Sequence, residues 1–183
     1  QGRQGAMLDA PVDMLDAPVD EEMAELLHVA EEGDVTRFAN LLDEDATLVH
    51  KTGEDGDSAL HIACLYGQQA IVEECLRRGA QVNIVDEDDS TPLHDACAGG
   101  YLAIVSLLLA QGAHLGVSDS DGDSPLHHAA NGGHVATVSL LLEHAGERRA
   151  EMLEMRNAVG SRPVDVAEAE EVRDVLTQAQ QAT

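Results

Sequence analysis

The sequence predicts an all-α repeat solenoid, a fold in which helical pairs stack along one axis. The first observation is a tetrapeptide that recurs at positions 58–61 (SALH), 91–94 (TPLH) and 124–127 (SPLH), a period of 33 residues. The second is that each copy opens the same pattern of a short helix, a tight loop and a second apolar helix. The third is composition, because the chain is 44% hydrophobic but only 2% aromatic. A fixed period and a core of small aliphatic residues are typical of repeat architectures.

The chain begins with a segment that does not fit the repeat. Residues 1–6 are interpreted as a tag remnant, and residues 7–13 (MLDAPVD) recur unchanged at 14–20. Because this leader is short, acidic and proline-containing, we expect residues 1–20 to be disordered.

Residues 21–52 are predicted to form an N-terminal cap. Met23 and Leu26 fall on one face of a first helix, Gly33 interrupts the pattern, and Phe38 and Leu42 fall on one face of a second. The tetrapeptide is absent here. A terminal unit with a polar outer face is what a solenoid needs at its end.

Three full units follow, at 53–85, 86–118 and 119–156. Each opens with a turn rich in Asp and Gly (GEDGD, DEDDS or DSDGD) and continues into two helices. Thr91 suits the N-cap of the first helix, and the proline after it suits the first helical turn. Gly112 suits a left-handed C-cap after the second helix.

The third unit carries an insert near residues 146–156 (GERRAEMLEMR), which we expect to lengthen the second helix or form a helical loop. Its arginines and methionines could form a second contact surface or pack against the cap. The motif then returns with Asp165 in place of histidine. Residues 157–178 are predicted to form a C-terminal cap, followed by a tail at 179–183.

These motifs in register resemble the ankyrin repeat family, over about residues 21–178. The departures are Ala59 in place of proline, Asp89 in place of the turn glycine, and the insert. The resemblance implies helix–loop–helix units with β-hairpin-like finger loops. It further implies that the fingers and first helices line a concave face that binds another protein, and that the motif histidine ties one finger to the next.

The formal charge of −25, from 35 acidic and 10 basic residues, restricts the class of partner. Such a surface repels nucleic acid and anionic membranes, and it attracts basic proteins. No apolar run is long enough to span a bilayer. Cys64, Cys75 and Cys97 lack the spacing of a metal site and are odd in number, which favours a reducing compartment, the cytoplasm or nucleus. We expect a monomer.

No enzyme, cofactor or metal site is predicted. His61, His94 and His127 lie one repeat apart, too far to share one ion. The acidic segment 119–123 (DSDGD) resembles the start of a calcium loop, but its glycine comes one place early and the final Glu is missing. A metal-dependent enzyme remains a remote alternative.

The family's variable groove positions, carried over by the resemblance, give the candidate binding residues. Most are acidic and none is Lys or Arg. Leu65 and Tyr66 would supply an apolar anchor. The full set is Glu54, Asp55, Asp57, Leu65, Tyr66, Glu87, Asp88, Ser90, Asp95, Asp121, Asp123, His128 and Asn131.

The predicted function is binding of a basic protein segment on an acidic concave face. One version is an escort, or chaperone, for a basic client such as a ribosomal protein or histone. The alternative is a scaffold or regulatory subunit that docks a partner's basic peptide or localisation signal.

Overall fold

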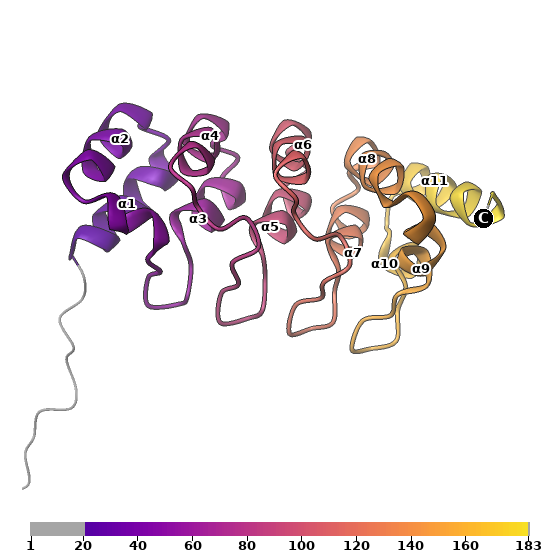
Figure 1. The fold of residues 1–183 in the computed structure, drawn as a ribbon. Coiled ribbons are helices and arrows are strands. Elements are labelled where there is room, and N and C mark those ends of the chain that lie inside the picture. Colours follow the sequence, from indigo (N-terminus) through magenta and orange to yellow (C-terminus); the bar gives the residue numbers. More distant parts are fainter. Residues whose placement is uncertain (1–20, 183) are drawn as a thin grey trace, which may run out of the picture.

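A computed structural model describes residues 21–182, and the predicted leader at 1–20 lies outside the described residues. Helical pairs stand side by side in one row, and loops project from the same side of each pair (Figure 1). The first helices are α1 (Glu21–Glu32), α3 (Ala59–Leu65), α5 (Pro92–Ala98), α7 (Pro125–Asn131) and α10 (Pro163–Val166). The second helices are α2 (Val35–Glu44), α4 (Gln69–Arg77), α6 (Leu102–Ala110), α8 (Val135–Ala145) and α11 (Glu170–Gln181). The prediction of an all-α repeat solenoid is confirmed.

The recurring tetrapeptide caps each short first helix. The backbone N–H of Thr91 donates to Nδ1 of His94 at 3.0 Å, and Ser58–His61 and Ser124–His127 repeat this arrangement. Because Nδ1 accepts this bond, the neutral ring carries its proton on Nε2. Burial lowers the pKa of all three histidines, that of His94 to about 4.

The histidine tie between neighbouring fingers is present in two of the three units. Nε2 of His61 lies 3.2 Å from the Ser90 carbonyl, and Nε2 of His127 lies 3.0 Å from that of Ser161. Nε2 of His94 is buried and has no hydrogen-bond partner among the described residues. Hydrogen-bond geometry for the implied role is met in the outer two units. In the middle unit burial lowers the pKa of His94, and the backbone groups of Val117 and Asp123 lie near His94 and oppose this effect.

The insert forms a helical loop. Helix α8 ends at Ala145, after which η2 (Gly146–Arg148) and α9 (Arg149–Glu154) follow. Met152 and Leu153 are buried, so the insert packs against the end of the stack.

The C-terminal cap uses a carboxylate where the other units use an imidazole. Asp165 accepts a hydrogen bond from the backbone N–H of Arg162 at 3.0 Å, at the start of α10. Helix α11 continues to Gln181, past the expected boundary at residue 178. The remaining short helix, η1 (Ala46–His50), joins α2 to the first finger.

The core runs through the whole stack and consists mainly of Ala, Val, Leu and Ile. Cys64, Cys75 and Cys97 are buried free thiols within it. Burial raises the pKa of Cys75 to about 12, so this thiol is not a nucleophile at neutral pH. Within residues 21–182, no helix has both the length and the apolar character needed to cross a membrane.

Candidate functional site

Four finger loops, at 53–57, 86–90, 119–123 and 157–161, share one turn geometry. In each finger, the backbone N–H of the first residue donates to the carbonyl oxygen of the fifth residue. The backbone N–H of the fourth residue donates to the carbonyl oxygen of the first residue. In the second and third fingers the first residue, Asp86 or Asp119, also accepts backbone N–H groups through Oδ1. The finger tips are thus held in place by main-chain and Asp hydrogen bonds.

Backbone hydrogen bonds also join each finger tip to the next. Glu87 N donates to Asp55 O at 3.3 Å, Ser120 N to Asp88 O at 2.8 Å, and Ala158 N to Asp121 O at 2.8 Å. In every case the third residue of one finger accepts from the second residue of the next, so successive fingers repeat the same contact. The predicted finger acids are brought together in one row.

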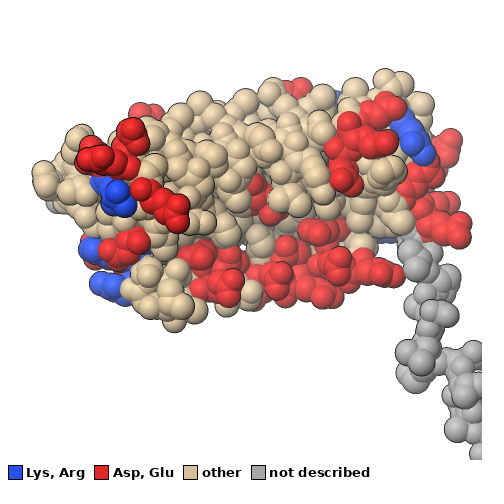
Figure 2. Space-filling view, turned by 180° about the vertical axis from the view of Figure 1, so that it is seen from behind, with Lys and Arg blue, Asp and Glu red and all other residues tan. Residues whose placement is uncertain are grey.

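We call the carboxylates of the first three fingers the acidic strip. It runs along one edge of the molecule and includes no Lys or Arg (Figure 2). The fourth finger, with Ala158 and Val159 at its tip, has no acid and ends the strip. The strip consists of Glu54, Asp55, Asp57, Asp86, Glu87, Asp88, Asp89, Asp119, Asp121 and Asp123.

Asp95, in α5, lies behind the strip in an unfavourable environment for a charge. Burial raises its pKa to about 8, and the neighbouring Asp57 and Asp86 contribute by repulsion. Its Oδ2 is buried without a hydrogen-bond partner among the described residues. Burial also raises the pKa of Asp57, with contributions from Asp86, Asp55 and Asp88. The acids where α5 meets the fingers are therefore harder to ionise than ordinary Asp side chains.

His128, one of the predicted binding residues, makes contacts with two neighbouring side chains. Its Nε2 lies 2.7 Å from Oδ2 of Asp119, and its ring packs edge-on against His94 at a centroid distance of 5.5 Å. Helix α7 thus places His128 between the first residue of its own finger and a histidine of the preceding unit.

Other predicted residues differ in how much they are available to a partner. Asp123 accepts a hydrogen bond from Asn157 at 2.8 Å, and Ser90 is held by His61 and Asp86, so both also serve the scaffold. The exposed members of the predicted set are Glu54, Asp55, Leu65, Tyr66, Glu87, Asp88, Asp121 and Asn131.

Tyr66 is 46% exposed, and a hydrogen bond with Glu31 raises the pKa of its hydroxyl. The predicted anchor therefore joins the first unit to the second while its ring remains accessible.

Sequence reasoning missed a row of contacts on the opposite side of the first helices, where the loops between paired helices meet. Gln68 Nε2 donates to the Glu31 carbonyl at 2.7 Å, and His134 Nε2 to the Ala98 carbonyl at 2.9 Å. The Tyr101 ring lies over the backbone of Gly67, where an added Cβ would meet it at 2.5 Å. Because Gln68, Tyr101 and His134 stand one period apart, aligning the units would have found them.

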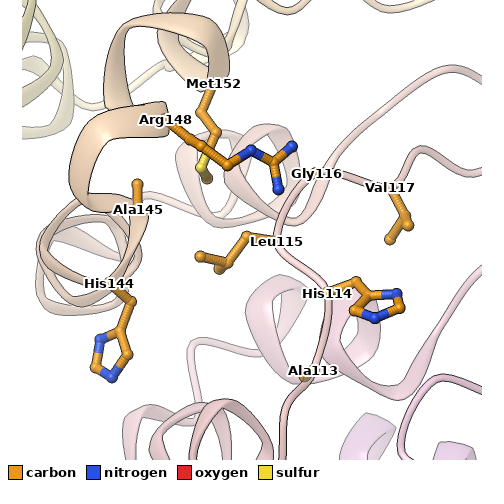
Figure 3. Close-up of a pocket in the computed structure, with 9 residues that line it drawn as sticks. All are labelled: Ala113, His114, Leu115, Gly116, Val117, His144, Ala145, Arg148 and Met152. Atoms are coloured by element: carbon orange, nitrogen blue, oxygen red, sulfur yellow. The ribbon is translucent and has the colours of Figure 1, made fainter.

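The insert borders a shallow cavity of about 460 Å³ between α8, α9 and the linker 113–117 (Figure 3). Leu115 and Met152 point into it, and Arg148 reaches toward Gly116. His114 and His144 lie on opposite sides, so no set of reactive groups converges there. Among the described residues, no group of three or more His, Cys, Asp or Glu side chains is placed to hold a metal ion.

Residues 26–119 match a family model of three ankyrin repeats, and residues 121–154 match a single ankyrin repeat. The chain belongs to the ankyrin repeat family. The match begins at residue 26 and so includes the helical pair that we predicted as a cap. Ankyrin repeats are protein–protein interaction modules, generally without enzymatic activity. No curated protein matches the sequence.

Proposed function

We propose that this ankyrin repeat domain acts as a monomer and binds a basic protein segment along the acidic strip. The observation that supports this most is the hydrogen-bonded row of fingers that carries carboxylates but no Lys or Arg. Each finger consists of two extended segments, so successive tips stand about 10 Å apart. This spacing is close to the Debye length of about 8 Å at physiological salt. The potentials of neighbouring fingers therefore overlap, which accelerates association with cationic partners.

Asp95 supports the proposal at the middle of the strip. Its counterpart in the next unit, His128, places a basic group against the finger residue Asp119. In the unit of Asp95, the corresponding finger residue is Asp86, and the two acids repel. A Lys or Arg side chain from a partner beside Asp86 would offset this repulsion.

We propose that the partner is a highly basic protein whose charge the domain shields until assembly, in the cytoplasm or nucleus. A ribosomal protein or a histone has this chemistry. A scaffold that docks a basic peptide or localisation signal would use the same surface. The escort and the scaffold differ in their effect on the bound protein. An escort keeps a basic protein soluble, whereas a scaffold does not have to do so.

A salt titration with matched peptides tests the proposal. A fluorescent peptide of about 20 residues rich in Lys and Arg is titrated at about 50, 150 and 300 mM salt, beside a control with Glu at each basic position. We expect the basic peptide to bind and to weaken steeply with salt, because exposed charges are screened. The control peptide should not bind. Absence of binding at low salt, or binding that salt does not change, would contradict the proposal.

A further inference from the structure

The exposed large apolar side chains of residues 21–182 are concentrated at one edge of the stack. They are Val35, Leu65, Tyr66, Val85, Leu102, Val135 and Val159. Leu65 and Tyr66 lie at the end of α3, whereas Val35, Leu102 and Val135 are the first residues of α2, α6 and α8. A single exposed apolar residue needs no explanation. Five such residues beside the loops that join paired helices do need an explanation.

These loops form a continuous surface, which we call the loop edge and define as residues 65–69, 98–102 and 131–135. Tyr101 covers Gly67 of the preceding unit, and His134 bonds to Ala98 of the unit before its own. The apolar residues that flank the loops are therefore held side by side by direct contacts between units.

The loop edge carries no Asp, Glu, Lys or Arg, in a chain with a formal charge of −25. Acids stand at both of its ends, with Glu31, Glu32 and Asp34 before it and Glu168, Glu170 and Glu171 after it. Figure 2 shows the same arrangement, an uncharged central surface with acidic groups at each end and the acidic strip below it.

The distance between the acidic strip and the loop edge limits what can contact both. The first helices α3, α5 and α7 run from the finger bases to the loop edge, and each has seven residues. Seven helical residues span about 10 Å, and an α-helix with its side chains is about 10–12 Å wide. One helix laid across these first helices would therefore reach the loop edge and the base of the acidic strip, where Asp86 and Asp119 lie.

We propose that the bound segment is an amphipathic helix, with basic side chains on the acidic strip and apolar side chains on the loop edge. This inference rests on the proposed function and adds the form of the partner. Charge complementarity selects the basic face, and the uncharged loop edge selects the apolar one. Such a helix combines electrostatic attraction with burial of apolar surface, which the strip alone cannot provide.

Three peptides of equal length and equal positive charge serve as probes. The first places Lys and Leu at helical spacing, so that the two types occupy opposite faces. The second has the same composition in an order that destroys this separation. The third replaces every Leu by Gln. We expect the first to bind at least tenfold more tightly than the other two.

Two protein variants locate the effect. Leu102→Ser combined with Val135→Ser alters the loop edge, and Val85→Ser, somewhat more exposed and in a linker, is the control. The double variant should lose the preference for the first peptide while keeping its salt dependence. The control variant should keep both the preference for the first peptide and the salt dependence. Circular dichroism checks that each variant is folded.

The outcomes separate this inference from the proposed function. If all three peptides bind equally, or if the double variant keeps the preference, the amphipathic helix is wrong and the acidic strip stands. If none of the peptides binds, the proposed function fails, and this inference fails with it.

Discussion

Nε2 of His128 lies 2.7 Å from Oδ2 of Asp119, so the finger acid of the third unit has a side-chain partner within its own unit. In the second unit the same two positions hold Asp95 and Asp86, which repel each other. The two units share the same backbone arrangement but differ by a single exchange of His for Asp at this position. This difference places a second carboxyl group, in place of an imidazole, behind the middle of the acidic strip.

Asp95→Asn should stabilise the domain in a pH-dependent manner. The pKa of Asp95 is about 8 in the folded state, against 3.8 for an ordinary Asp side chain. Between these values the folded state retains a proton that the unfolded state has lost, so stability falls as pH rises through this window. Because an Asn side chain does not ionise, the variant lacks this pH dependence. We expect the variant to gain on the order of 2 kcal/mol at pH 8.5 and little at pH 4.5.

Urea denaturation of wild type and variant at both pH values measures this difference. Glu54→Gln, at an exposed finger tip, is the control and should stay within about 0.5 kcal/mol of wild type at each pH. An equal gain for Asp95→Asn at pH 4.5 and 8.5 would show that charge is not the cause.

Asp89→Gly should stabilise the second finger. Asp89 has a φ of +57°, whereas Gly56 and Gly122 hold the equivalent turn positions with φ of +79° and +78°. The left-handed region costs an ordinary residue about 1 kcal/mol, so glycine should raise the free energy of unfolding by about 0.5–1 kcal/mol.

The reverse change tests the same turn in the third finger. Gly122→Ala should destabilise the domain, because the new Cβ would lie 2.7 Å from the backbone nitrogen of Ala158. Thermal unfolding of both variants should give shifts of opposite sign. Shifts of the same sign would mean that backbone conformation does not control these turns.

Met152→Ala should destabilise the stack by about 2–5 kcal/mol, the usual range for a truncated core residue. Met152 is only 1% exposed, although it lies in the insert. Met155 is only partly buried, so Met155→Ala should cost clearly less. Chemical denaturation compares the two, and equal small losses would mean that the insert is not part of the core.

The repeat period predicts most of the backbone, because the cap, the first-turn proline and the turn glycine each act within a few residues. Hence the positions of the fingers, and the left-handed conformation at Asp89, follow from the sequence. The hydrogen-bond and packing partners of individual side chains do not follow from the sequence. The contact of His128 with Asp119 depends on how a helix sits on its own finger, and the loop edge depends on contacts between units.

The most direct measurement of the central claim is the affinity of the Lys- and Arg-rich peptide for the variant Asp88→Lys with Asp121→Lys. The control is Glu44→Lys with Glu143→Lys, which makes the same change in net charge on exposed residues of α2 and α8. We predict that the finger variant stays folded and binds at least tenfold more weakly, about 1.4 kcal/mol, and that the control loses much less. Unchanged affinity in the finger variant, or equal losses in both, would contradict binding on the acidic strip.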